Sequence, residues 1–174
     1  WERDYFWHQM LCAKGYIIVS VDNRGTGGRG AKFKKCTYKQ LGKFETEDQI
    51  EAAKYLGTLP YIDKTRIGIW GWSYGGYMSC YALTYASDVF THGMAGGSVT
   101  DWTLYDSHYT ERFMGTPANN AEGYKNSSAL THVNKYKGML QIVHGMIDDN
   151  VHIQNSIQLI SKLQDLKKDF EFMP

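Results

Sequence analysis

Short runs of β-branched and apolar residues alternate with segments of helical periodicity along the chain. The predicted helices span residues 2–14, 74–85 and 155–167, and a further helix runs from the capping-box pattern Thr46-x-x-Gln49 to Leu56. Residues 100–136 are rich in aromatic side chains and are predicted to be irregular. The predicted strands span residues 16–22, 66–71, 93–99, 139–144 and 170–173. This alternation predicts an α/β fold with a mostly parallel sheet.

The composition is that of a globular protein and argues against several other classes. The 174 residues, 43% of them hydrophobic, suffice for one domain with a substantial core. A formal net charge of +1 argues against a nucleic-acid partner, because nucleic acids select a basic surface. No run of about 18 apolar residues occurs, so no transmembrane segment is predicted. The thirteen tyrosines indicate either an aromatic core or a pocket lined by rings.

The cysteines and glycines give no sign of a metal or a nucleotide. Three cysteines without a C-x-x-C pair predict neither a disulfide framework nor a zinc site, and Cys12 and Cys80 are expected in the core. No other metal-ligand spacing occurs, so no metal and no cofactor are expected. The segment Gly25-Thr-Gly-Gly-Arg-Gly30 has the form of a dinucleotide fingerprint. The residues that follow, 31–36, are basic and lack an apolar helical face, so we interpret the glycines as a turn.

The segment Gly71-Trp-Ser-Tyr-Gly75 lies between a predicted strand and a predicted helix. G-x-S-x-G in this position is typical of the nucleophile elbow of α/β-hydrolases, a sharp turn that lifts the serine hydroxyl clear of the sheet. We expect a strained backbone at Ser73. We also expect side chains at positions 71 and 75 to collide with the adjoining strand and helix. The Tyr74 N–H would face a developing oxyanion, where one such donor contributes about 2.7–4 kcal/mol.

A serine nucleophile needs a base and an acid that orients the base. In this fold the acid follows the serine along the chain, and the histidine comes last. Asp148, in the loop after the predicted strand 139–144, is the predicted acid, and Asp149 is the alternative. The histidine should follow the strand 170–173. None of the six histidines has that position, so we expect the base to lie beyond Pro174.

Motifs spread over nearly the whole chain carry a resemblance to a known family. They are Gly71-Trp-Ser-Tyr-Gly-Gly-Tyr77, Gly145-x-x-Asp-Asp-Asn-Val-His152, Asp22-x-Arg-Gly25, Phe44-Glu-x-Glu-Asp-Gln-Ile-Glu-Ala-Ala53, Trp102 and Tyr105-Asp-Ser-x-Tyr-Thr-Glu-Arg112. Together they resemble the catalytic domain of the dipeptidyl peptidase IV group in the prolyl oligopeptidase family of serine peptidases. The resemblance implies an aminopeptidase that releases X-Pro, and less readily X-Ala, dipeptides from peptide N-termini through an acyl-enzyme.

The resemblance also implies roles for particular residues. Ser73 matches the nucleophile, Asp148 matches the triad acid, and Tyr74 matches the backbone donor of the oxyanion hole. Asn150 matches a polar contact to the substrate backbone. The walls of the proline-binding S1 pocket match Tyr74, Val99, Trp102, Tyr105, Tyr109 and Val151. Flat aromatic walls suit proline, because its ring is rigid and its nitrogen carries no hydrogen.

The resemblance further implies parts that lie outside residues 1–174. We expect this chain to be a partial α/β-hydrolase catalytic domain, truncated at both ends. The β-propeller that holds the peptide amine, the tyrosine of the oxyanion hole and the catalytic histidine would lie elsewhere, so the chain alone is expected to be inactive. The family implies a homodimer in the periplasm, in the cell envelope or outside the cell.

Other functions stay open at this point. A related acylaminoacyl or prolyl oligopeptidase-type hydrolase would carry the same elbow, and the missing histidine favours a non-catalytic fragment. The run Asp148-Asp-Asn-Val151 and the rings of Trp102, Tyr105 and Tyr109 favour the dipeptidyl peptidase.

Overall fold

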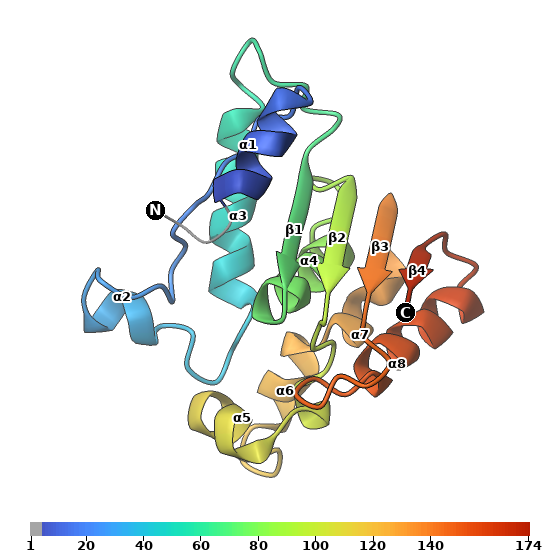
Figure 1. Ribbon diagram of the computed structural model, residues 1–174. Coiled ribbons are helices and arrows are strands. Elements are labelled where there is room, and N and C mark those ends of the chain that lie inside the picture. The colour runs from blue at the N-terminus through green and yellow to red at the C-terminus, as the bar shows by residue number, and fades with distance from the viewer. Residues whose placement is uncertain (1–4) are drawn as a thin grey trace.

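A four-stranded parallel sheet forms the centre of the computed structural model, which describes residues 5–174 (Figure 1). The strands lie in the order β1 (Gly68–Trp72), β2 (His92–Gly96), β3 (Met139–Val143) and β4 (Glu171–Met173). All of their pairings are parallel, with Ile69 opposite Gly93 and Ile142 opposite Phe172. The α/β class and the parallel sheet predicted from the sequence are therefore confirmed.

Helices connect the strands and precede the sheet. α4 (Tyr74–Tyr85) links β1 to β2, and α8 (Gln154–Asp165) links β3 to β4. Figure 1 shows α5 and α6 beyond the carboxyl ends of the strands, which is where ligands bind in parallel α/β sheets. The remaining helices are α1 (Tyr5–Ala13), α2 (Ala31–Lys35), α3 (Lys43–Leu56), η1 (Trp102–Leu104), α5 (Ser107–Met114), α6 (Ala121–Ser127), α7 (Ala129–His132) and η2 (Val133–Lys135). No helix among residues 5–174 is long and apolar enough to cross a membrane.

Helix α4 forms the centre of the core. All nine of its residues from Gly76 to Thr84 are buried, as expected for a helix without a solvent-facing side. The helix packs on β1 and β2 and also contacts α3 and α7. Leu83 of α4 belongs to one apolar cluster with Ile142 of β3 and Leu159 of α8. Because α4 is fixed on so many sides, the residue that precedes it is fixed relative to the sheet.

The glycine-rich loop is tied to α3 by Arg24. The guanidinium of Arg24 bonds Asp48 at 2.7 Å and Glu47 at 3.2 Å, and it lies 4.4 Å above the ring of Phe44. The hydrogen bond to Asp48 raises the pKa of Arg24. These contacts give Arg24 and the acidic residues of α3 a structural role in holding the loop.

Predictions for the first part of the chain are partly wrong. Residues 16–22 form no strand, and Tyr16 and Ile17 are 62% and 55% exposed. An apolar run becomes a strand only where a neighbouring strand takes its hydrogen bonds, and this segment lies outside the ladders of β1–β4. Helix α1 buries none of its residues, so Cys12 is exposed instead of lying in the core, whereas Cys80 is buried as predicted.

Three further segments differ from the prediction. Helix α3 begins at Lys43, after Gly42 with φ 88°, so Thr46 lies inside the helix and is buried instead of capping it. Five residues of the basic stretch 31–36, from Ala31 to Lys35, form the short helix α2 despite their lack of an apolar face. The stretch 100–136, predicted to be irregular, contains five short helical elements. Asp101 and Asp106 cap two of them, accepting the N–H of Thr103 and Tyr109.

Candidate active site

Ser73 occupies the sharp turn between β1 and α4. Its backbone has φ 57° and ψ −114°, a strained state that costs about 1–3 kcal/mol for a residue with a side chain. The surroundings maintain it, because the Ser73 N–H donates to the Gly96 carbonyl at 2.8 Å and the Tyr77 N–H donates to the Ser73 carbonyl at 2.9 Å. The Ser73 hydroxyl caps no N–H of α4, and the residue is partly exposed. The strain predicted from the motif is therefore confirmed.

The glycines around Ser73 have different roles. A Cβ at Gly71 would lie 2.5 Å from the carbonyl carbon of Gly75, so the collision predicted at position 71 is confirmed. A Cβ at Gly76 would overlap the Gly96 carbonyl, which makes Gly76 necessary for the close approach of α4 to β2. A Cβ at Gly75 would meet nothing within 4 Å among the atoms of residues 5–174, so the collision predicted there is wrong.

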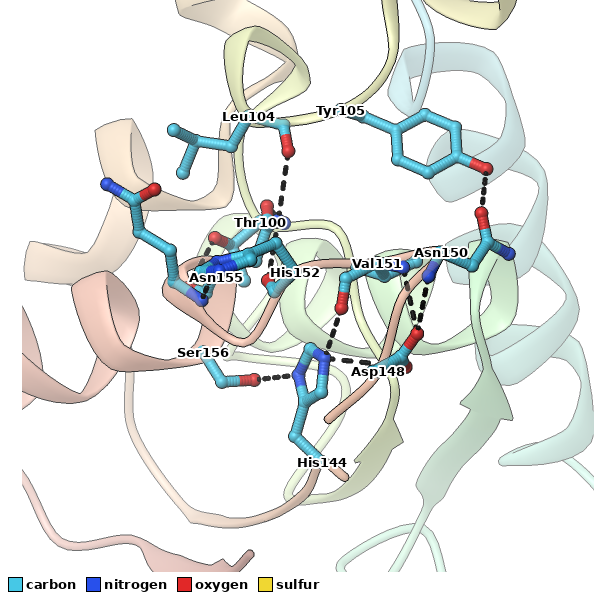
Figure 2. Close-up of polar contacts among 11 residues, drawn as sticks. Thr100, Leu104, Tyr105, His144, Asp148, Asn150, Val151, His152, Asn155 and Ser156 are labelled. Atoms are coloured by element: carbon cyan, nitrogen blue, oxygen red, sulfur yellow. Dashed lines mark hydrogen bonds and ion pairs between the residues drawn. The ribbon is translucent and has the colours of Figure 1, made fainter. Parts of the chain in front are cut away.

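Asp148 lies in the loop that follows β3, and its carboxylate is anchored from two sides (Figure 2). Oδ1 accepts the backbone N–H groups of Asn150 at 3.0 Å and Val151 at 2.9 Å. Oδ2 lies 3.6 Å from Nε2 of His144, and the side chain of Asp148 is 21% exposed. The carboxylate is therefore held in one orientation while a group approaching from solvent can still reach it. Asp149, the alternative acid, is exposed.

The predicted pocket residues meet in one apolar cluster. The ring of Trp102 stacks on Tyr109 at 6.0 Å between centroids and contacts Tyr74 at 5.7 Å and Tyr105 at 6.1 Å. Segments far apart in the sequence are thus joined into one aromatic surface that includes the residue after Ser73. The members predicted from the sequence are the buried Val99, Trp102 and Val151 and the partly buried Tyr74, Tyr105 and Tyr109.

Within this cluster the rings differ in accessibility. Trp102 is only 1% exposed, so Tyr74, Tyr105 and Tyr109 carry the rings that a ligand could touch. The Tyr105 hydroxyl donates to Oδ1 of Asn150 at 2.8 Å, which joins the pocket segment to the Asp148 loop (Figure 2). Burial raises the pKa of Tyr105 and of Tyr109, so both phenols stay neutral at physiological pH.

Glu45 is a buried carboxyl group to which the sequence analysis gave no role. Its Oε1 accepts the Tyr74 hydroxyl at 2.7 Å, and Oε2 is buried without a hydrogen-bond partner among residues 5–174. The residue is 4% exposed, and burial raises the pKa of its carboxyl group. Burial also raises the pKa of Tyr74 well above the ordinary value. Glu45 therefore ties the ring of Tyr74, beside Ser73, to the first turn of α3.

No histidine of residues 5–174 is hydrogen-bonded to Ser73. His144 is the one beside Asp148, but it follows β3, two strands away from β1, or about 10 Å across a sheet. The other rings contact Trp70 (His8), Thr91 (His92), Arg112 (His108), Asn126 (His132) and Gln154 (His152). The placement of the base beyond Pro174 stays a prediction. Within the described residues, no group of three His, Cys, Asp or Glu side chains could hold a metal ion.

Buried polar residues that the sequence analysis missed connect the two halves of the site. Asn155, in the first turn of α8, accepts the Thr100 N–H at 2.9 Å and donates to the Leu104 carbonyl at 3.2 Å. The Thr100 hydroxyl donates in turn to the Asn155 carbonyl at 2.7 Å. Asn155 therefore links the helix after the Asp148 loop to the segment that carries Trp102. The only sequence signal for it is an amide at the start of an amphipathic helix.

A strained serine between a strand and a buried helix, followed by an anchored aspartate after a later parallel strand, defines a class of protein. This arrangement is that of the α/β-hydrolase fold. Residues 3–173 match the prolyl oligopeptidase family, and the chain belongs to this family.

The similar proteins are dipeptidyl peptidases. The protein named "Probable dipeptidyl-aminopeptidase B" of Arthroderma benhamiae is 51% identical over 154 residues, which cover 87% of this chain and 17% of that protein. Dipeptidyl-aminopeptidase B of Aspergillus niger is 49% identical over 161 residues, which cover 91% of this chain and 18% of that protein. The crystal structure of Porphyromonas gingivalis dipeptidyl peptidase 4 matches with a TM-score of 0.94 and 51% identity, over 95% of this chain and 24% of that one. The chain therefore spans less than a quarter of the length of these relatives.

Proposed function

We propose that this chain is the core of a serine exopeptidase that releases X-Pro or X-Ala dipeptides from the N-termini of peptides. The observation that carries the proposal is the aromatic cluster joined to the strained Ser73 turn and, through the bond from Tyr105 to Asn150, to the Asp148 loop. The relatives named dipeptidyl-aminopeptidase and dipeptidyl peptidase support it.

The proposed reaction begins at Ser73. Its Oγ attacks the carbonyl carbon of the second substrate residue, and a histidine from outside residues 1–174 takes the hydroxyl proton. The same histidine passes the proton to the leaving amine, so an acyl-enzyme forms and the rest of the peptide departs. Asp148 orients this histidine. The Tyr74 N–H stabilises the oxyanion by about 2.7–4 kcal/mol. Water then attacks the acyl-enzyme and releases the dipeptide.

The cluster determines which second residue is accepted. Tyr74, Tyr105 and Tyr109 border the pocket, and the buried Trp102 supports them from behind. A proline ring fills such a space by apolar contact, alanine fills less of it, and larger side chains would overpack it. Oδ1 of Asn150 is occupied by the Tyr105 hydroxyl, which leaves the NH₂ group of Asn150 to donate to a substrate carbonyl.

The assembly of the whole protein is part of the proposal. Family resemblance supports a homodimer outside the cytoplasm, in the periplasm, the cell envelope or the extracellular space. Sedimentation of the full-length protein tests the dimer.

A substrate comparison with the full-length protein tests the proposed function. A Gly-Pro chromogenic substrate should be cleaved much faster than an acetyl-Ala substrate, and Ser73→Ala should remove at least about 10³ of the rate. Faster cleavage of acetyl-Ala would replace the proposal with an acylaminoacyl-type hydrolase. Near-normal turnover by Ser73→Ala would refute the assignment of the nucleophile.

A further inference from the structure

His144 is the one fully buried histidine among residues 5–174, and the mechanism above gives it no task. It stands immediately after β3, at the start of the loop that carries Asp148. Nδ1 lies 2.6 Å from Oγ of Ser156 in α8, and Nε2 lies 2.7 Å from the carbonyl oxygen of Val151. Figure 2 shows the ring enclosed between these two partners and Asp148. A polar ring at such a position either supports the loop or performs chemistry.

The partners decide which ring nitrogen carries the hydrogen. A carbonyl oxygen only accepts, so Nε2 must carry a hydrogen to bond Val151. In the neutral ring, Nδ1 is then an acceptor, and the hydroxyl of Ser156 can donate to it. Both nitrogens are therefore engaged inside the protein. His144 cannot serve as the base that Ser73 requires, although it is the histidine beside the aspartate.

The same Nε2–H also faces the carboxylate of Asp148. Oδ1 of Asp148 is occupied by the N–H groups of Asn150 and Val151, which leaves Oδ2 as the oxygen to face a catalytic histidine. Nε2 of His144 lies 3.6 Å from that Oδ2, beyond hydrogen-bond length but close enough for electrostatic attraction. One ring thus bonds the end of the loop, at Val151, and attracts the carboxylate in its middle.

We propose that His144 is a positioning residue for Asp148: its Nε2–H closes the loop 145–150 onto Val151 and fixes the direction of the carboxylate. Ser156 holds the ring in the required tautomer from the opposite side. This inference rests on the proposed function only for its catalytic consequence, because a loop held in place matters to turnover if Asp148 is the triad acid. The closure of the loop can be measured without any turnover.

The first experiment measures the loop itself in the full-length protein. Hydrogen exchange of the amides of Asn150 and Val151 should be at least about tenfold faster in His144→Leu, which keeps an apolar group of similar size but donates nothing. His144→Gln retains an N–H near the position of Nε2 and should restore most of the protection. His132→Leu is the matched control, because its ring also contacts a backbone carbonyl, that of Asn126, on another part of the chain.

The second experiment measures turnover per active site, titrated with a fluorophosphonate. His144→Leu should lower kcat for a Gly-Pro substrate about 10–100-fold, since a misplacement near 1 Å costs about 10²-fold. His144→Gln should recover most of kcat, and His132→Leu should leave it unchanged. A merely structural role would lower the melting temperature and the titrated fraction, but not kcat per titrated site.

The outcomes are distinct. Unchanged exchange at Asn150 and Val151 in His144→Leu, or a ¹⁵N spectrum that shows the hydrogen of His144 on Nδ1, overturns the proposal. If His144→Leu fails to fold, Ser156→Ala replaces it as the test, because it removes the partner of Nδ1. Ser156→Ala should give a smaller increase in exchange at Asn150 and Val151 and a smaller fall in kcat, and no change in either overturns the proposal. If the wild-type protein lacks dipeptidyl peptidase activity while His144→Leu and His144→Gln show this exchange pattern, the loop closure is supported and the proposed function is refuted.

Discussion

Replacing Trp102 by alanine tests the claim that the aromatic cluster is a packed wall supported from behind. Trp102 is 1% exposed and contacts the rings of Tyr74, Tyr77, Tyr105 and Tyr109, the nearest of them Tyr77 at 4.9 Å between centroids. Alanine would therefore leave a cavity the size of an indole that is closed on all sides. The stability of the Trp102→Ala variant should therefore fall, whether or not its preference for proline changes.

The expected loss can be estimated from this environment. Removing a buried Phe or Trp side chain costs about 3–5 kcal/mol in protein cores. Four ring contacts of Trp102 disappear at once, and each such pair contributes about 0.5–1.5 kcal/mol. We therefore expect the upper part of the range, about 4–5 kcal/mol. For a domain of this size that corresponds to a melting temperature lower by about 8–20 °C.

Urea unfolding followed by circular dichroism measures the loss. Trp72→Ala is the matched control, because Trp72 is 60% exposed at the end of β1 and should cost less than about 1.5 kcal/mol. Equal losses for the two variants would contradict the claim that Trp102 supports the cluster from behind. So would a Trp102→Ala protein of normal stability that has lost its preference for proline, because the ring would then face the ligand directly.

Three further predictions concern the turn, the buried carboxyl and the missed amide. Gly71→Ala should cost about 1–3 kcal/mol or prevent folding and Gly75→Ala less than about 1 kcal/mol, because only the first Cβ meets backbone; equal costs in urea would contradict this turn geometry. Burial raises the pKa of Glu45 above 4.5, so the folded state binds this proton more tightly and stability falls as the pH rises from about 4.5 through the raised pKa. Glu45→Gln should remove that part of the pH dependence in urea unfolding at pH 4–8, and an unchanged profile would show that the group is not perturbed. Asn155→Ala should cost about 1–3 kcal/mol by leaving its buried partners unpaired. A loss under about 0.5 kcal/mol in the same assay would mean that water takes the place of the Asn155 amide and bonds these partners.

The fold was predictable where a run of apolar residues packs against the sheet or against α4. The run 139–144 and the pattern 155–167 became β3 and α8 because each buries its apolar residues against α4 or the sheet. The run 16–22 has the same strand-like composition but lies outside the ladders of the sheet, so its propensity did not decide its structure.

The candidate site was likewise predictable only in part. The Ser73 turn follows from glycine spacing, and the membership of Trp102 in the aromatic cluster followed from resemblance. Glu45, His144 and Asn155 could not be predicted, because their importance comes from partners distant in sequence. For Glu45 that partner is the Tyr74 hydroxyl, and for Asn155 it is the Thr100 N–H. Local patterns therefore point to the proposed nucleophile better than to the residues that hold it in place.

Identification of the activated serine tests the proposed nucleophile most directly. A fluorophosphonate probe reacts with a serine whose hydroxyl is activated, and mass spectrometry locates the adduct. We expect one adduct in the full-length protein, on Ser73, lost in Ser73→Ala and absent from the 174-residue chain alone, which would lack the base. An adduct on another serine, or an unlabelled full-length protein, would contradict the claim that Ser73 is the nucleophile. Labelling of the 174-residue chain would show that the base lies within it.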